Sequence, residues 1–379
     1  MSFLKSNIFT KMFIISILKL PTPMNINIWW NFGSMLGLFL MIQIITGFLL
    51  SMHYCPNTDM AFNSVIHIMK DVNSGWLIRL MHMNGASFYF IMMYIHISRN
   101  IWYTSFKLTK VWSVGIMIML LSMMTAFLGY VLPWGQMSFW GATVITNLMS
   151  AIPYLGETMV KWIWGGYSIN NATLNRFYSL HFIMPLVIML LVVIHLFLLH
   201  LTGSNNSMGF DSKIYMVEFH PYFMIKDLLG FTMIIMIYMF INLQLPYYLG
   251  DPDNFKIANS MVTPVHIKPE WYFLFAYSIL RAIPNKLGGV VALMMSILIL
   301  LTMPMFKNYL NKSNKFYPIS QLIYWFFINN FILLTWLGGQ LIEYPYINVN
   351  LMFTYLYFLY FFTFSYFNRT WDLIINMKL

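Results

Sequence analysis

The sequence has 379 residues, of which 60% are hydrophobic and only 8% are charged. A soluble globular protein carries about 25% charged residues, so this chain cannot cover a water-facing surface and must lie in a membrane. Its net charge of +10 is scattered without a dense basic block, which indicates an anionic membrane face rather than nucleic acid as partner. The single cysteine, Cys55, excludes an internal disulfide, a four-cysteine iron–sulfur site and a Cys-x-x-Cys-His haem attachment.

Long stretches without Lys, Arg, Asp or Glu predict the membrane-spanning helices. Each stretch can hold the roughly 20 apolar residues that a spanning helix needs. Turn signals at Pro133 and Pro153 predict loops after the third helix. The sequence therefore predicts an all-α integral membrane protein with eight transmembrane helices, near residues 30–52, 76–103, 112–132, 174–201, 227–245, 288–307, 319–338 and 348–366.

An even number of spans puts both termini on one side of the membrane. That side receives 13 of the 21 Lys and Arg residues, and the opposite side receives 8. Basic residues accumulate in the short loops of the inner face. We therefore expect both termini to lie inside.

The loop 246–286 lies on the outer side and contains five prolines. It also contains an uncharged run, Trp271 to Leu280, that is too short to span a membrane. Such a segment is typical of an interfacial or re-entrant structure. A long loop in a compact membrane protein is usually functional, so we expect this one to carry chemistry.

Four histidines fall inside two of the predicted helices, His82 and His96 on the second, His181 and His195 on the fourth. The members of each pair are 14 residues apart, which is about 3.9 helical turns and about 21 Å, so each pair lies on one face. Because the second and fourth helices run parallel, we expect His82 to match His181 in depth and His96 to match His195.

Two facing imidazoles at each of two depths are typical of two stacked bis-histidine haems, which suit electron transfer because no iron position stays open for oxygen. A lone intramembrane histidine is more often a packing group or a member of a proton relay. Two pairs with equal spacing favour the haem interpretation. The first four helices would then form a bundle that holds two b-type haems.

Four glycines repeat the same spacing: Gly33 and Gly47 on the first helix, Gly115 and Gly129 on the third. Glycine has no side chain, so a bulky planar ring can approach the backbone there. The opposite direction of these helices puts Gly33 and Gly115 at the inner histidine depth, and Gly47 and Gly129 at the outer one. Close helix packing through small residues is the alternative interpretation.

Two arginines flank the histidines on the second helix. Arg79 lies three residues before His82, and Arg99 lies three residues after His96, each toward the nearer membrane face. Arginine forks match carboxylates, so these side chains are candidates to bind haem propionates. Interfacial anchoring of the helix ends is the alternative.

The sequence resembles the mitochondrial cytochrome b family, the membrane core of ubiquinol–cytochrome c reductase (respiratory complex III), over essentially its whole length. The resemblance depends on the two histidine pairs, the four glycines, the stretch 141–147 and the motif Pro269-Glu270-Trp271-Tyr272. It implies a quinone cycle: ubiquinol is oxidised near the outer face, and electrons pass inward through two non-covalent haem b groups to a second quinone pocket. Protons are released outside and taken up inside.

The resemblance also implies an assembly and a location. The expected partners are a Rieske-type iron–sulfur protein, cytochrome c1 and other subunits of complex III, in a dimeric complex. The expected location is the mitochondrial inner membrane, with both termini on the matrix side. We expect residues 1–210 to form the di-haem bundle, and residues 211–379 to supply four more helices and the long outer loop.

Quinol oxidation releases protons, so a titratable group must reach the outer pocket. Glu270 is the acidic residue of the loop from Asn254 to Lys286, and an aromatic run follows it. A solvated loop carboxylate is the alternative reading of Glu270. By similarity to the family, Glu270 accepts a quinol proton, and the pocket is lined by Pro269, Tyr272, Phe273, Tyr277, Phe127, Tyr130 and Gly141.

The inner pocket is expected between the fourth and fifth helices. His200 and Asp227 lie near their inner ends, and each could hydrogen-bond one quinone carbonyl. An interfacial histidine is the alternative for His200. Ser204 and Lys226 lie at the same inner helix ends, and the family resemblance adds Trp30, Asn31 and Ser34 to this pocket.

Two other functions stay open from the residues alone. A di-haem subunit of another quinone oxidoreductase would need the histidines but not the motif of the long loop. A proton-coupled transporter would use the histidines as a relay, and it would need intramembrane carboxylates and broken helices, which the predicted spans lack.

Overall fold

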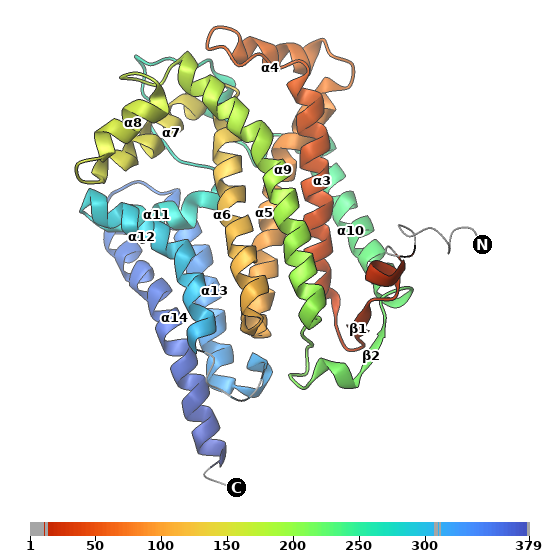
Figure 1. Cartoon of the computed structure of the whole chain (residues 1–379). Helices are drawn as coiled ribbons and strands as arrows, with labels where there is room; N and C mark the ends of the chain where they lie inside the picture. Colours follow the sequence, from red (N-terminus) through yellow and green to blue (C-terminus); the bar gives the residue numbers. More distant parts are fainter. Residues whose placement is uncertain (1–10, 12–13, 307–309, 311, 377–379) are drawn as a thin grey trace.

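The structure is a computed structural model that describes residues 11, 14–306, 310 and 312–376. Long helices run side by side through the molecule, with shorter helices and loops at both ends (Figure 1). The long helices are α3 (Asn31–Ser51), α5 (Gly75–Trp102), α6 (Thr109–Val131), α9 (Asn171–Thr202), α10 (Tyr222–Gln244), α12 (Lys286–Leu298) with its continuation η8 (Ile299–Phe306), α13 (Pro318–Gly338) and α14 (Tyr346–Asn376).

Helices form at all eight predicted positions. Among the described residues, seven are long and apolar enough to cross a membrane, and α5 is the exception. With 28 residues, α5 is long enough, at about 42 Å, but it carries His82, Asn84, His96 and Arg99. The predicted sixth span ended at residue 307, which lies outside the described residues.

The outer end of the molecule is more helical than the sequence predicted. The prediction of loops after the third helix was wrong in part, because α7 (Gln136–Asn147) and α8 (Gly156–Trp164) form between the turns. A further short helix, α4 (Ala61–Lys70), follows α3 at the same end (Figure 1). The uncharged run of the long loop forms η7 (Trp271–Phe273) and α11 (Leu274–Ala282), which lies across the ends of α13 and α14 (Figure 1).

At the opposite end, the chain before α3 pairs with the chain before α10. Strand β1 (Pro21–Pro23) is antiparallel to β2 (Met216–Glu218), with Pro21 opposite Glu218. The last turn of α14 and the first turn of α3 both lie at this end (Figure 1). The described parts of the two ends of the chain are therefore on the same side, as an even number of spans requires.

Local sequence determines where several of these helices begin. Asn170 starts α9 with a capping box, in which its side chain accepts from Ala172 N and its own N–H donates to Thr173 Oγ1. Asn285 caps α12 by accepting from Gly288 N at 2.9 Å. These caps satisfy backbone groups at the helix ends that carry the outer loops.

The first bundle consists of α3 packed on α5, α6 packed on α9, and α3 in contact with α9. α10 lies beyond the expected boundary at residue 210 but packs on α3 and α5. Polar bonds join it to α5, since Asn84 Nδ2 donates to Asn242 Oδ1 and to the Pro246 carbonyl, both at 3.1 Å. The Tyr238 hydroxyl donates to the Met81 carbonyl at 2.5 Å. The division of the chain at residue 210 stays a prediction.

We expect the Asn84→Ala variant to be less stable than the parent. Asn84 is fully buried, and its loss leaves Asn242 Oδ1 and the Pro246 carbonyl without their donor. Interhelical hydrogen bonds in membranes contribute about 0.6 to 1.7 kcal/mol, so the Tm of the purified complex should fall. Asn175→Ala is the control, because exposed Asn175 bonds only within its own helix. Equal Tm values for the two variants would contradict this role.

Candidate functional site

The outer histidines of α5 and α9 face each other. The ring centroids of His82 and His181 are 6.1 Å apart, with an interplanar angle of 88°. His82 Nδ1 lies 2.9 Å from Thr46 Oγ1, and His181 Nδ1 donates to the Thr125 carbonyl at 2.8 Å. Because both Nδ1 atoms are engaged, Nε2 is the nitrogen that each ring presents to a ligand.

The inner histidines have a cationic neighbour. A guanidinium nitrogen of Arg99 lies 3.3 Å from His96 Nδ1, and the same guanidinium stacks over the Trp30 ring at 4.9 Å. His195, on α9, lies against Gly115 of α6. The inner pair therefore sits beside a positive charge, as a group with anionic substituents requires.

All four glycines contact a histidine ring at the predicted depth. A Cβ added at Gly33 would lie 3.3 Å from His96 Cε1, and one at Gly115 would lie 3.3 Å from His195 Cε1. At Gly47 the distance to His82 Cε1 would be 2.9 Å, and at Gly129 a Cβ would overlap the His181 ring. The absence of a side chain at these positions lets each imidazole pack directly on the backbone of the neighbouring helix.

A cavity of about 750 Å³ opens at the outer pair, within the size range of small-molecule and cofactor sites. Its walls come from α3, α4, α5, α6 and α9, and they include Gly47, His82, Gly129, His181 and Arg79. This lining fits a flat, anionic group with a metal at its centre. The two imidazole nitrogens can bind the metal, the two glycines leave flat backbone surfaces, and the guanidinium can bind the anionic substituents.

The same cavity reaches the motif of the long loop. Glu270, Asp251 and Tyr130 belong to its lining. Burial, and next the neighbouring carboxylate of Asp251, raise the pKa of Glu270 to about 7. Glu270 can therefore gain or lose a proton near neutral pH, which a general base requires.

Aromatic packing fixes the residues after Glu270 against α5. The Tyr272 ring stacks on Phe90 with centroids 4.3 Å apart, and the Tyr94 hydroxyl donates to the Tyr272 carbonyl. Trp271 Nε1 donates to Ser87 Oγ at 3.1 Å. Tyr272 also lines the cavity, so the histidines and the loop motif share α5 as their support.

The other residues expected in the outer pocket lie near this cavity without lining it, among the residues described. Phe273 contacts Phe90 with ring centroids 6.0 Å apart, and Phe127 contacts Phe177 at 6.0 Å. The Tyr277 hydroxyl donates to the Ile267 carbonyl at 3.2 Å, which ties α11 to the loop before Glu270. The residues outside the lining are Phe127, Gly141, Pro269, Phe273 and Tyr277.

At the inner end, α3 and α10 are joined by the residues expected around the second pocket. Ser34 Oγ donates to Asp227 Oδ1 at 2.8 Å, and Asn31 Nδ2 donates to the Lys226 carbonyl at 2.7 Å. Lys226 Nζ donates to the Ile26 carbonyl at 3.2 Å. Asp227 is thus held by α3.

His200 lies apart from this cluster. It is exposed on α9, and Ser204 follows the end of that helix. α3 lies between α9 and α10 (Figure 1), so His200 and Asp227 are on helices that flank α3 on either side. Among the described contacts, no hydrogen bond joins the two.

Sequence reasoning missed the groups that orient the histidines. Thr46 directly precedes Gly47, and Thr125 lies four residues before Gly129, which is about one turn on the same helix face. The hydroxyl of Thr46 beside Gly47 was an available signal, whereas Thr125 acts through its backbone carbonyl, which no sequence pattern marks.

We expect Gly47→Ala to perturb the group held by His82 and His181. The added methyl would meet the His82 ring at 2.9 Å, so the imidazole must tilt from its bond with Thr46. Gly37→Ala, on the same helix, is the matched control, because a Cβ there meets no atom within 4 Å. Reduced-minus-oxidised spectra should show one haem component shifted or lost only in Gly47→Ala. Identical spectra in the two variants would refute the role of the glycine contact.

Comparisons with known proteins find relatives that match nearly the whole chain. Residues 17–203 match the family model described as cytochrome b/b6/petB, and residues 257–358 match cytochrome b(C-terminal)/b6/petD. The chain is 68% identical to cytochrome b of Apis mellifera ligustica over 375 residues, which are 99% of this chain and 97% of that protein.

Solved structures give the same result. The fold matches a chain of a structure titled hyperthermophilic respiratory complex III, with a TM-score of 0.92 and 31% identity. The match covers 97% of this chain and 98% of that chain. The chain therefore belongs to the cytochrome b family, the multi-pass membrane subunits that carry electrons within ubiquinol–cytochrome c reductase, bind two b-type haems and use ubiquinone.

Proposed function

We propose that His82 and His181 are the axial ligands of the outer haem, and that His96 and His195 are those of the inner haem. The observation that carries this assignment is the facing outer pair, whose Nδ1 atoms are both engaged by α3 and α6. When bound, each haem supplies a redox centre that accepts and passes on one electron. The protein orients the imidazoles, and the backbones of Gly33, Gly47, Gly115 and Gly129 leave room for them.

Arg79 and Arg99 bind the haem propionates in this proposal. Arg79 lines the cavity of the outer pair, and Arg99 reaches the inner pair while it stacks on Trp30. Each guanidinium would compensate carboxylate charge in a region from which water is largely excluded. Neither arginine forms an ion pair with a protein carboxylate among the described residues, so both can serve a ligand.

Quinol oxidation takes place at the outer end, with Glu270 as the proton acceptor. Glu270 lines the cavity, and its pKa near 7 lets it receive a proton from the quinol hydroxyl. Because the loop that carries Glu270 lies at the outer end of the molecule, the proton is then released at the outer surface. The quinol ring would lie among the apolar and aromatic residues near Glu270, namely Tyr272, Phe127, Tyr130, Gly141, Pro269, Phe273 and Tyr277.

Quinone reduction takes place at the inner end. Asp227 would donate a hydrogen bond or proton to one quinone carbonyl, and its carboxyl is already positioned by Ser34. His200, exposed on α9, would reach the opposite carbonyl. The walls of this pocket would come from Trp30, Asn31, Ser34, Ser204 and Lys226.

The cycle needs partners because the quinol gives up two electrons by separate routes. The chain has one cysteine, so the iron–sulfur centre that takes the first electron belongs to another subunit. We infer a Rieske-type protein and cytochrome c1 as neighbours in a dimeric complex. The location is the mitochondrial inner membrane with both termini on the matrix side, and residues 1–210 and 211–379 form the di-haem and the loop-bearing parts.

We expect the Glu270→Gln variant to oxidise quinol about 100-fold more slowly or worse, because the amide cannot accept a proton. In the parent, the rate should rise as the pH rises through about 7, since Glu270 loses its proton and becomes a base. In the variant this rise should disappear. The measurement is steady-state cytochrome c reduction by a ubiquinol analogue from pH 5.5 to 8.5.

The matched control is Glu157→Gln, because Glu157 is an exposed outer carboxylate paired only with Lys161 at 3.9 Å. Its rates and pH profile should equal those of the parent. Both variants should retain both haem spectra. A parental pH profile in Glu270→Gln would refute the proton-acceptor role.

A further inference from the structure

The loop between Asp251 and Glu270 has little regular structure of its own. It begins with the short turn η6 (Pro252–Phe255), and residues 258–270, all of them described, form no helix or strand. Yet both carboxylates line the same cavity. Contacts with another part of the chain must therefore hold the loop in place.

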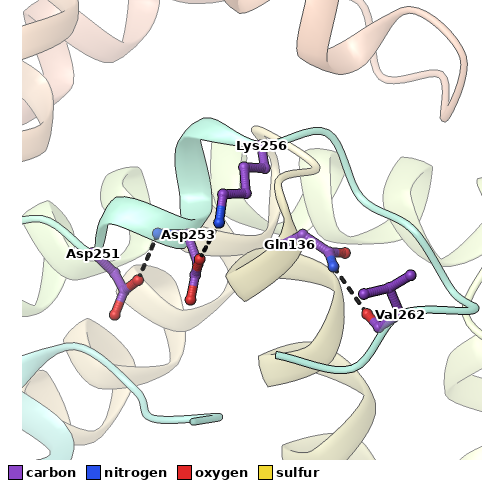
Figure 2. A network of polar contacts seen from close by, with 5 residues as sticks. All are labelled: Gln136, Asp251, Asp253, Lys256 and Val262. Atoms are coloured by element: carbon purple, nitrogen blue, oxygen red, sulfur yellow. Dashed lines mark hydrogen bonds and ion pairs between the residues drawn. The ribbon is translucent and has the colours of Figure 1, made fainter. Parts of the chain in front are cut away.

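Tyr277 of α11 holds the loop at Ile267, and the contacts with its residues 256–262 come from the start of α7, at the corner after α6. Gln136 Nε2 donates to the Val262 carbonyl at 2.9 Å, and Gln136 Oε1 accepts from Asn259 N at 2.7 Å. The backbone N–H of Gln136 donates to the Lys256 carbonyl at 2.9 Å. One residue thus makes three hydrogen bonds to the loop, and Figure 2 shows its side chain pointing at Val262.

The residues next to Gln136 also contact the loop, at Asn254. Asn254 Oδ1 accepts from Ser138 N at 2.9 Å, and a Cβ at Gly135 would lie 2.5 Å from the Asn254 carbonyl oxygen. The loop therefore packs directly on the backbone of this corner. Gln136 is only 7% exposed, so the two hydrogen bonds of its side chain are formed away from water and are costly to lose.

The turn η6 connects the residues held by Gln136 with Asp251. Lys256 Nζ pairs with Asp253 Oδ1 at 2.9 Å, and Asp253 N donates to Asp251 Oδ1 at 2.9 Å (Figure 2). The second oxygen of Asp251 lies 3.6 Å from Lys268 Nζ, two residues before Glu270. The side chain of Asp251 is 10% exposed. The bonds of Gln136 thus lie, along the chain, between the two carboxylates.

We propose that Gln136 is a positioning residue of the outer site, whose amide holds residues 259–262 on the start of α7 and so keeps Asp251 and Glu270 at the cavity wall. This inference rests on the proposed function of Glu270. According to this inference, Gln136 does not line the cavity itself but controls which charged groups lie close to Glu270.

Five titratable groups face Glu270: Asp251 and Lys268 of the loop, Arg79 of α5, Tyr130 of α6 and Tyr272 of η7. Those on α5 and α6 belong to rigid helices, and those on the loop move if it is released. Release would expose Glu270 to water and separate it from the like charge of Asp251. Both changes favour the carboxylate and lower its pKa.

The test compares the parent complex with Gln136→Met, which keeps the length of the side chain and removes both hydrogen bonds. We expect the pH midpoint of quinol oxidation to fall by about one unit. The plateau rate at high pH should fall about tenfold, because the carboxylate is misplaced. The KM for ubiquinol and both haem spectra should stay near the parental values. Gln340→Met is the control, because among the described contacts the side chain of Gln340 bonds only to the Trp336 carbonyl of its own helix end, at 3.5 Å.

A parental midpoint and plateau rate in Gln136→Met would overturn the inference. If this variant does not assemble, Gln136→Asn decides, because its side chain is one methylene shorter, which draws both amide atoms away from Asn259 N and the Val262 carbonyl without adding a charge. It should shift the midpoint in the same direction by a smaller amount, and parental values would again overturn the inference. Glu270→Gln separates the two claims: if it retains the parental pH profile, the proposed function itself fails.

Discussion

The direct contact between glycine backbones and imidazole rings is the constraint on which the rest of the structure depends. We expect a flat group and two imidazoles to fit between α5 and α9 because α3 and α6 present no side chain beside the histidine rings, where four glycines lie at two depths. The same helices supply the acceptors for the outer Nδ1 atoms, at Thr46 and Thr125. Spacing, orientation and clearance thus come from one set of helix contacts, which explains why the histidines and glycines share a 14-residue period.

The outer site combines this rigid bundle with a loop that must be held in place. α5 carries the outer histidine on one turn and, through Ser87, Phe90 and Tyr94, supports the residues that follow Glu270. The loop before Glu270 is tied to α11 by Tyr277 near its end, and its earlier residues depend on hydrogen bonds to the start of α7. The proposed haem ligands and the proposed proton acceptor are therefore held by different means, so we expect substitutions to change the proton chemistry without disturbing the haem.

Periodicity made the bundle predictable from sequence. Fourteen residues return to the same helix face, and parallel helices then fix which histidines share a depth, so His82 could be matched with His181 before any coordinates. The helices α7 and α8 were not predicted, because the turn signals at Pro133 and Pro153 were interpreted as parts of one loop. The contacts of Gln136 with Asn259 and Val262 could not be foreseen, because they join residues more than 120 positions apart through an amide that follows no periodic pattern.

The most direct test of this account replaces His82, His96, His181 and His195 with leucine one at a time, and compares the reduced-minus-oxidised spectra of the four complexes at low temperature. The account predicts that His82→Leu and His181→Leu lose the same haem component, and that His96→Leu and His195→Leu lose the other. A spectrum shared by His82→Leu and His195→Leu would contradict it, because those histidines would then bind one haem across two depths of the bundle.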